Sequence, residues 1–373
     1  MSPWFAISLF FALTLVLVVL PFLPALRELR QKKDADPLRV VSDSEVDIRY
    51  FALQFTKFLK IRLGDAMTAC AESGTPSEGA LDDGTPYLIM PNGSGAILSQ
   101  SEEEARAARR MILSCGDLAL PAETMFLPEV FAAGSIQGSE RCIYRAILAG
   151  QGIDLAAGSL TLRWVHAGGP VRIGERSVLY GRISSDERID VDPGCSFERL
   201  YAPRIVFGAD RRAHGVDTPD GARERRELQP DDLPNLIDDA AGRWLYEHDL
   251  EIPPESRIVA DVVATGELVV GGDTRIEGSI KSREPLRLEP GTEITGSVVS
   301  GGDLSIGMEC RIGGPVIAEG NIRIESGAVI GTAASLTTVS GEGITIDTGV
   351  TIHGTIWAHT AGKVASDGAD VRT

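Results

Sequence analysis

The side chains of this sequence that are best suited to proton transfer near neutral pH are its five histidines, because the imidazole pKa lies close to physiological pH. They are His166, His214, His248, His353 and His359. In the run TIHGTI, His353 stands between two isoleucines that we expect to face inward, so it is predicted to point into solvent. We expect His166 at a turn between strands and the other three in charged or terminal stretches. No histidine is therefore predicted to be catalytic.

The five cysteines are odd in number and widely spaced, without a CxxC pair or a Cys/His cluster at metal-ligand spacing. They are Cys70, Cys115, Cys142, Cys195 and Cys310. We expect reduced thiols in a cytosolic compartment.

Other chemistry-bearing motifs are absent from the sequence or weak. Gly271-Gly272-Asp273 resembles one turn of a calcium-binding repeat, but the aspartate does not recur in the next repeats, so it predicts a plain turn. The sequence has no P-loop, GxGxxG, HExxH or GxSxG motif. The aspartates and glutamates are many and spread along the sequence. The sequence therefore neither identifies nor excludes a pair of carboxylates of the kind that glycosidases use. We predict no catalytic, cofactor-binding or metal-ligating residue, no cofactor and no enzymatic activity.

The formal net charge of −17 argues against a nucleic-acid partner, because binding to phosphate backbones depends on clustered lysine and arginine.

The segment from Trp4 to Leu26 contains no charged residue and is about as long as a helix that crosses a bilayer. It is followed by Arg27, Arg30, Lys32 and Lys33, which predicts a single-pass inner-membrane protein whose C-terminal domain lies in the cytoplasm. The lipid bilayer is thus an expected partner. A cleaved signal peptide is the alternative, although the segment lacks a basic start and an A-x-A-like cleavage site.

An internal repeat of 18 residues is the strongest pattern in the sequence. Apolar residues recur from Leu250 to Ile356 with spacings of two, six, four and six. The positions are Leu250, Ile252, Ile258, Val262, Leu268, Val270, Ile276, Ile280, Leu286, Leu288, Ile294, Val298, Leu304, Ile306, Ile312, Val316, Ile322, Ile324, Ile330, Ala334 and, after a four-residue insertion, Ile344, Ile346, Ile352 and Ile356.

This spacing predicts short strands that bend at glycine-rich corners and stack turn upon turn, because one turn alone cannot bury its apolar face. A degenerate version of the template covers Leu118 to Phe207. The predicted fold class is all-β: a right-handed parallel β-helix with 18-residue rungs, an N-terminal transmembrane helix and one or two short helices. The helices are expected from about Ser44 to Gly64, as an amphipathic helix, and from Ser101 to Leu113.

The composition predicts six regions along the chain. They are a transmembrane anchor with a basic flank (1–33), a juxtamembrane linker with the amphipathic helix (34–114), a degenerate first β-helix block (115–208), a charged insertion or linker (209–249), a regular β-helix block (250–358) and a polar tail (359–373).

The recurrent L-x-I and I-x-G-x-I/V units between Leu268 and Val316, as in RIEGSIKS and EITGSVVS, resemble those of the bactofilins. These are polymer-forming bacterial cytoskeletal proteins. The resemblance covers Leu250 to Ile356 and implies a triangular right-handed β-helix that assembles end to end as a scaffold for envelope or morphogenetic enzymes. The long N-terminal region, the degenerate block and the charged insertion depart from that family's pattern.

The expected function is therefore a membrane-anchored, bactofilin-like scaffold that forms a homo-polymer or recruits protein partners in the cell envelope. The alternative is a left-handed β-helix acyltransferase of the hexapeptide kind, because three hexads also make 18 residues per turn.

Overall fold

The computed structural model describes residues 4–5, 13–14, 20, 48–92, 97–208, 225–239 and 242–366. The chain divides into two units, Met1–Asp47 and Ile48–Thr373. The second unit holds every described strand and both clusters of buried apolar side chains.

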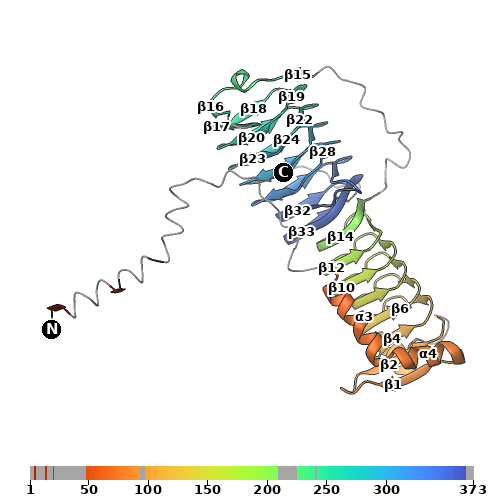
Figure 1. The fold of residues 1–373 in the computed structure, drawn as a ribbon. Coiled ribbons are helices and arrows are strands. Elements are labelled where there is room, and N and C mark those ends of the chain that lie inside the picture. Colours follow the sequence, from red (N-terminus) through yellow and green to blue (C-terminus); the bar gives the residue numbers. More distant parts are fainter. Residues whose placement is uncertain are drawn as a thin grey trace. The chain divides into compact units, whose positions relative to one another are not determined.

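The second unit is mostly β-structure, a parallel β-solenoid of about 13 turns with few helices (Figure 1). Its strands form two blocks, which we call the N-block (residues 77–208) and the C-block (residues 225–366). Each turn contributes to three walls, named A, B and C below, and each wall is a ladder of strands from successive turns. The 18-residue repeat is thus one circuit of the three walls.

In the N-block, five long strands bend from wall A into wall B, and short strands form wall C. The long strands are β6 (Met125–Ala132), β8 (Ile143–Ala149), β10 (Leu160–Ala167), β12 (Val178–Ser185) and β14 (Ser196–Phe207). Wall A starts with β3 (Ala107–Ala108), and wall B with β2 (Pro86–Met90) and β4 (Met111–Ser114). Wall C consists of β5 (Leu118–Ala119), β7 (Ile136–Gln137), β9 (Ile153–Leu155), β11 (Val171–Ile173) and β13 (Arg188–Val191), and the end of β14 continues it.

In the C-block most strands are short and each belongs to one wall. Wall A contains β18 (Leu250–Ile252), β21 (Leu268–Val270), β24 (Leu286–Leu288), β27 (Leu304–Ile306) and β30 (Ile322–Ile324). Wall B contains β17 (Arg243–Tyr246), β20 (Asp261–Ala264), β23 (Ile280–Ser282), β26 (Val298–Ser300) and β29 (Val316–Ala318). Wall C contains β15 (Arg226–Glu227), β19 (Ser256–Ile258), β22 (Arg275–Ile276), β25 (Glu293–Ile294), β28 (Arg311–Ile312) and β31 (Val329–Ile330). The long strands β32 (Thr337–Ile346), in walls B and A, and β33 (Val350–Val364), in all three walls, complete the C-block.

The predicted template positions fill the interior. All of the apolar positions from Leu250 to Ile356 are buried except Ala334, which is exposed. Val339 takes the position expected for Ala334, because it pairs with Val316 in β29 of the preceding turn. The insertion therefore lies between Ile330 and Val339, earlier than predicted.

Among the described residues of the second unit, three helices precede the regular turns of the N-block. They are α3 (Tyr50–Arg62), α4 (Gly64–Ser73) and α5 (Gln100–Ala105). The helix expected from Ser101 to Leu113 is thus short, and β3 and β4 follow it. The solenoid pairing begins at β2, before residue 115, and strands β15 to β17 lie within residues 209–249.

The predicted transmembrane helix needs correction. No helix in the described part of the chain is long and apolar enough to cross a membrane. Of the segment from Trp4 to Leu26, only Trp4–Phe5, Leu13–Thr14 and Leu20 are described, and the rest of the prediction lies outside the described residues. The prediction rested on the length of this segment and its lack of charged residues.

Candidate interaction surfaces

The two blocks are joined by an antiparallel pairing of their last strands, β14 and β33 (Figure 1). Leu200 pairs with Ile356 in wall B, and Ile205 pairs with Ile352 in wall C. Each wall therefore runs unbroken from one block into the other, although the two blocks run in opposite directions. We call this pairing the joint.

Side chains on both sides of the joint hold it together. The guanidinium of Arg199 lies 4.1 Å from the ring centre of Trp357, and the Nδ1 of His353 lies 2.8 Å from the backbone oxygen of Pro203. The prediction that His353 points freely into solvent is thus wrong, because its ring is half-buried against the other block. Its role in this structure is a structural hydrogen bond.

His166 lies in β10, not at a turn, and its residue is 7% exposed. Its Nδ1 is 2.9 Å from the hydroxyl oxygen of Ser184, and its Nε2 is 3.9 Å from a carboxylate oxygen of Asp186. The three side chains have the types of a hydrolase triad, but Ser184 is 1% exposed and its hydroxyl also donates to the carbonyl of Val165. A substrate could not reach this hydroxyl, so the cluster does not form a nucleophilic site.

The remaining histidines are placed apart from one another. His359 stacks on Trp357 with ring centres 4.8 Å apart, and its Nε2 is 3.2 Å from the hydroxyl of Ser340. His248 occupies a turn with a φ of 69°, and His214 lies outside the described residues.

Helix α3 covers wall B of the N-block. Its inward residues Ala52 and Leu59 are buried, and the ring of Phe55 lies 5.5 Å from that of Trp164. Beneath α3 and α4, wall B presents an outward column of apolar side chains, one per turn: Ile89, Leu113, Phe131 and Leu148. At its start, Arg49 pairs with Asp186 at 3.4 Å and lies over the ring of Tyr201. The predicted amphipathic helix thus packs on the solenoid.

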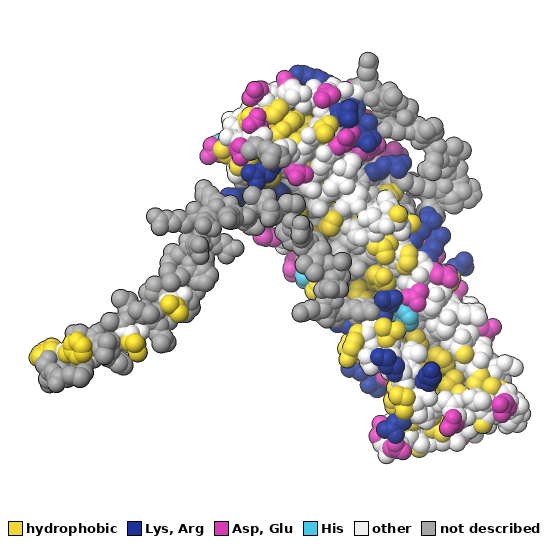
Figure 2. Space-filling model, viewed as in Figure 1, with side chains coloured by type: hydrophobic (Ala, Val, Ile, Leu, Met, Phe, Trp, Pro, Cys, Tyr) yellow, Lys and Arg dark blue, Asp and Glu magenta, His cyan; other side chains and the backbone are white. Residues whose placement is uncertain are grey.

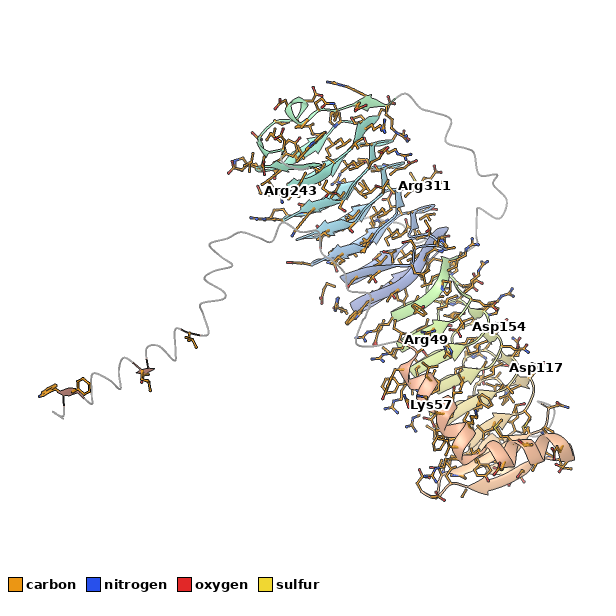
Figure 3. All side chains as sticks on the ribbon, viewed as in Figure 1. Arg49, Lys57, Asp117, Asp154, Arg243 and Arg311 are labelled. Atoms are coloured by element: carbon orange, nitrogen blue, oxygen red, sulfur yellow. The ribbon has the colours of Figure 1, made fainter. Side chains whose placement is uncertain are left out.

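Two shallow grooves follow the walls. A groove of about 650 Å³ lies on wall C of the N-block and includes Asp117, Gln137, Asp154 and Arg172. Figure 3 shows Asp117 and Asp154 on a different side of the block from Arg49 and Lys57 of the α3 region. A groove of about 290 Å³ lies on wall A of the C-block. No histidine or cysteine lines either groove.

The five cysteines are free thiols. Burial raises the pKa of the thiols of Cys195 and Cys310 to about 11 each, so both stay protonated at neutral pH. Within the described residues, no group of three or more histidine, cysteine, aspartate or glutamate side chains could hold a metal ion.

The apolar core is closed off at the outer end of each block. At the start of the N-block, Ile97 and Leu98 cover the core, and the carboxylate of Glu102 accepts hydrogen bonds from the backbone N–H groups of Ser99 and Arg109, each at 2.9 Å. Burial raises the pKa of Glu102, but these bonds and the charge of Arg110 outweigh it, so this pKa lies below its usual value.

At the start of the C-block, Leu228 and Leu233 are buried against the core on either side of the 3-10 helix η3 (Pro230–Asp232). The hydroxyl of Tyr246 donates to the carbonyl of Pro230 at 3.0 Å, and β16 (Leu236–Asp238) pairs antiparallel with β17. These contacts close the second outer end.

Comparison with protein-family models, curated proteins and solved structures found no match for this chain. The joint was missed from the sequence. Antiparallel pairing of two distant strands leaves no periodic signal, although the apolar residues Leu228 and Leu233 within a charged stretch were a sign of the second cap.

Proposed function

We propose that this protein is a non-enzymatic structural scaffold, of the general kind that its repeat's resemblance to the bactofilins implies. The observation that carries the proposal is the joint. It merges two solenoid blocks into one continuous three-walled surface, and that surface offers long ladders of outward side chains for partner proteins.

The closed ends favour a discrete particle over an open end-to-end polymer. Strand edges at the end of a solenoid can pair with another copy when they are exposed. Here β14 and β33, the last strands of the two blocks, pair with each other, β16 pairs with the edge of β17, and non-repeating segments cover the apolar core at the two outer ends. Recruitment along the walls is therefore the mode of scaffolding that we propose.

The acyltransferase alternative receives no specific support. It needs a general base beside a groove that holds the acyl donor. The histidines of the described chain lie under α3, at the joint or in a turn, and none lines a groove.

Electron microscopy and light scattering of the full chain in mild detergent test the proposal. We expect discrete particles of fixed mass at all salt concentrations, and acetyl-CoA should produce no binding heat in calorimetry. The double variant Leu228→Asp/Leu233→Asp should open the C-block end and produce larger assemblies, whereas Ile237→Asp, at an exposed position near the same end, should not. Filaments of the unmodified chain, or binding of acetyl-CoA, would contradict the proposal.

A further inference from the structure

The outward face of α3 has a composition unlike the rest of this acidic chain. Helix α3 contains three basic residues, Lys57, Lys60 and Arg62, and no acidic residue, whereas the whole chain has a net charge of −17. Arg62 pairs with Asp82 at 2.6 Å. Lys57 and Lys60 are exposed and have no ion-pair partner among the described residues. Two unbalanced positive charges thus lie close together on one helix face.

Large apolar side chains lie on the same face, and solvent covers them. Ile61 is 79% exposed, Tyr50 52% and Leu53 42%. With Lys57 they occupy positions 50, 53, 57 and 61, the spacing of a single helical face. The opposite face holds Ala52, Phe55 and Leu59 against the solenoid, so packing within the unit does not account for the outward residues.

The neighbouring edge of wall B extends this surface. Leu162 and Tyr180 are 45% and 49% exposed, and each lies two residues before a residue that contacts α3. Those residues are Trp164, which contacts Phe55, and Arg182, whose guanidinium lies 5.0 Å from the ring centre of Phe51. Figure 2 shows apolar and basic side chains together over this part of the N-block.

We propose that this surface, formed by the outward face of α3 with Leu162 and Tyr180, docks onto the headgroup region of an anionic lipid bilayer. A helix with lysines among exposed aromatic and aliphatic side chains matches such an interface, because the apolar groups enter the acyl boundary while lysine ammonium groups reach lipid phosphates. The acidic remainder of the chain is repelled by the same bilayer, so the unit is held by this face. The inference does not depend on the scaffold role.

A vesicle experiment on the full chain tests this docking. Binding to vesicles of phosphatidylcholine mixed with phosphatidylglycerol should exceed binding to pure phosphatidylcholine. Lys57→Gln/Lys60→Gln should weaken the anionic-lipid increment roughly 30-fold, since each lysine near such a surface contributes a factor of about five to six. The control Lys281→Gln removes an exposed lysine from wall B of the C-block and should change the increment by much less. The increment is the difference in binding between the anionic and the pure phosphatidylcholine vesicles. Binding by any other part of the chain that does not depend on lipid charge is therefore subtracted.

A site-specific probe gives a second readout. In a Cys115→Ser background, which leaves only buried cysteines, an environment-sensitive dye on Ile61→Cys should shift to the blue with anionic vesicles. The same dye on Met308→Cys, 51% exposed in the C-block, should not shift. An unshifted dye at position 61, or an increment unaffected by the lysine variant, would overturn the proposal. A lipid-independent dimer that the lysine variant dissociates would assign this face to self-association instead.

Discussion

Wall B is covered by a helix in the N-block and by no described element in the C-block, although the two stretches form one ladder through the joint. One of the two outward columns of the wall shows a clear difference between the blocks. In the N-block the column beneath α3 and α4 contains Ile89, Leu113, Phe131 and Leu148. The corresponding C-block column, one residue before each inward-facing residue of the wall, contains Asp261, Ser279, Ser297 and Pro315.

The polar side chains of this C-block column form hydrogen bonds with the backbone of the next turn. A carboxylate oxygen of Asp261 accepts from the backbone N–H of Ser279 at 2.6 Å, and the hydroxyl of Ser279 accepts from the N–H of Ser297 at 3.1 Å. Such a column needs no cover, whereas an apolar column exposed to water costs free energy that a helix recovers by burying it. The interior pattern of the two blocks is alike, so we relate the difference in cover to this outward column, which is apolar in the N-block and mostly polar in the C-block.

The largest effect should come from weakening this cover. Leu59→Ala removes a side chain that is 4% exposed between α3 and wall B, and it should lower the free energy of unfolding by about 2–5 kcal/mol. Hydrogen exchange in α3 should accelerate. Val299→Ala, on the uncovered part of wall B, should change stability by no more than about 0.5 kcal/mol. Equal losses in the two variants would show that the walls do not differ in this way.

A substitution at the joint should have the next largest effect. A Cβ at Gly362 would lie 2.2 Å from the ring of Phe197, which is itself packed against Phe207. Gly362→Val should therefore cost about 1–3 kcal/mol and raise hydrogen exchange in β14 and β33 together. Lys363→Ala, next to it and exposed, is the control. Faster exchange in β33 alone would mean that the blocks do not depend on each other.

The smallest effect should be a difference between the two closed ends in how their stability depends on pH. The folded pKa of Glu102 is lowered, so its contribution to stability is complete above the ordinary glutamate pKa and is lost as pH falls through the folded pKa. Mild acid should thus loosen the N-block end before the C-block end, which the apolar Leu228 and Leu233 close. Glu102→Gln should abolish this pH dependence and cost on the order of 1 kcal/mol at neutral pH. Equal acid sensitivity of hydrogen exchange at both ends would contradict this.

The repeat allowed the interior to be predicted from sequence, because side chains that return to the core once per turn must be apolar at fixed intervals. Leu268, Ile276 and Ile280 lie where the spacing indicated. Ala334 was misplaced because the loop before β32 shifts the register, and a small residue does not mark which side of an insertion it belongs to. The amphipathic helix expected to end near Gly64 is present as α3, which ends at Arg62.

The candidate surfaces could be predicted much less well. The contacts of His353 with Pro203 and of Arg199 with Trp357 join residues about 150 positions apart, and no local pattern encodes them. They arise because two blocks of nearly equal geometry present matching strand edges.

The joint also has a consequence for synthesis on the ribosome. Strand β14 is complete when residue 207 emerges, but its partner β33 ends only at residue 364. At roughly 5–20 residues per second, the edge of the finished N-block stays open for on the order of ten to thirty seconds in every newly made molecule. During that interval nascent chains on one messenger could pair through this edge, and a message truncated before β33 would leave it open permanently.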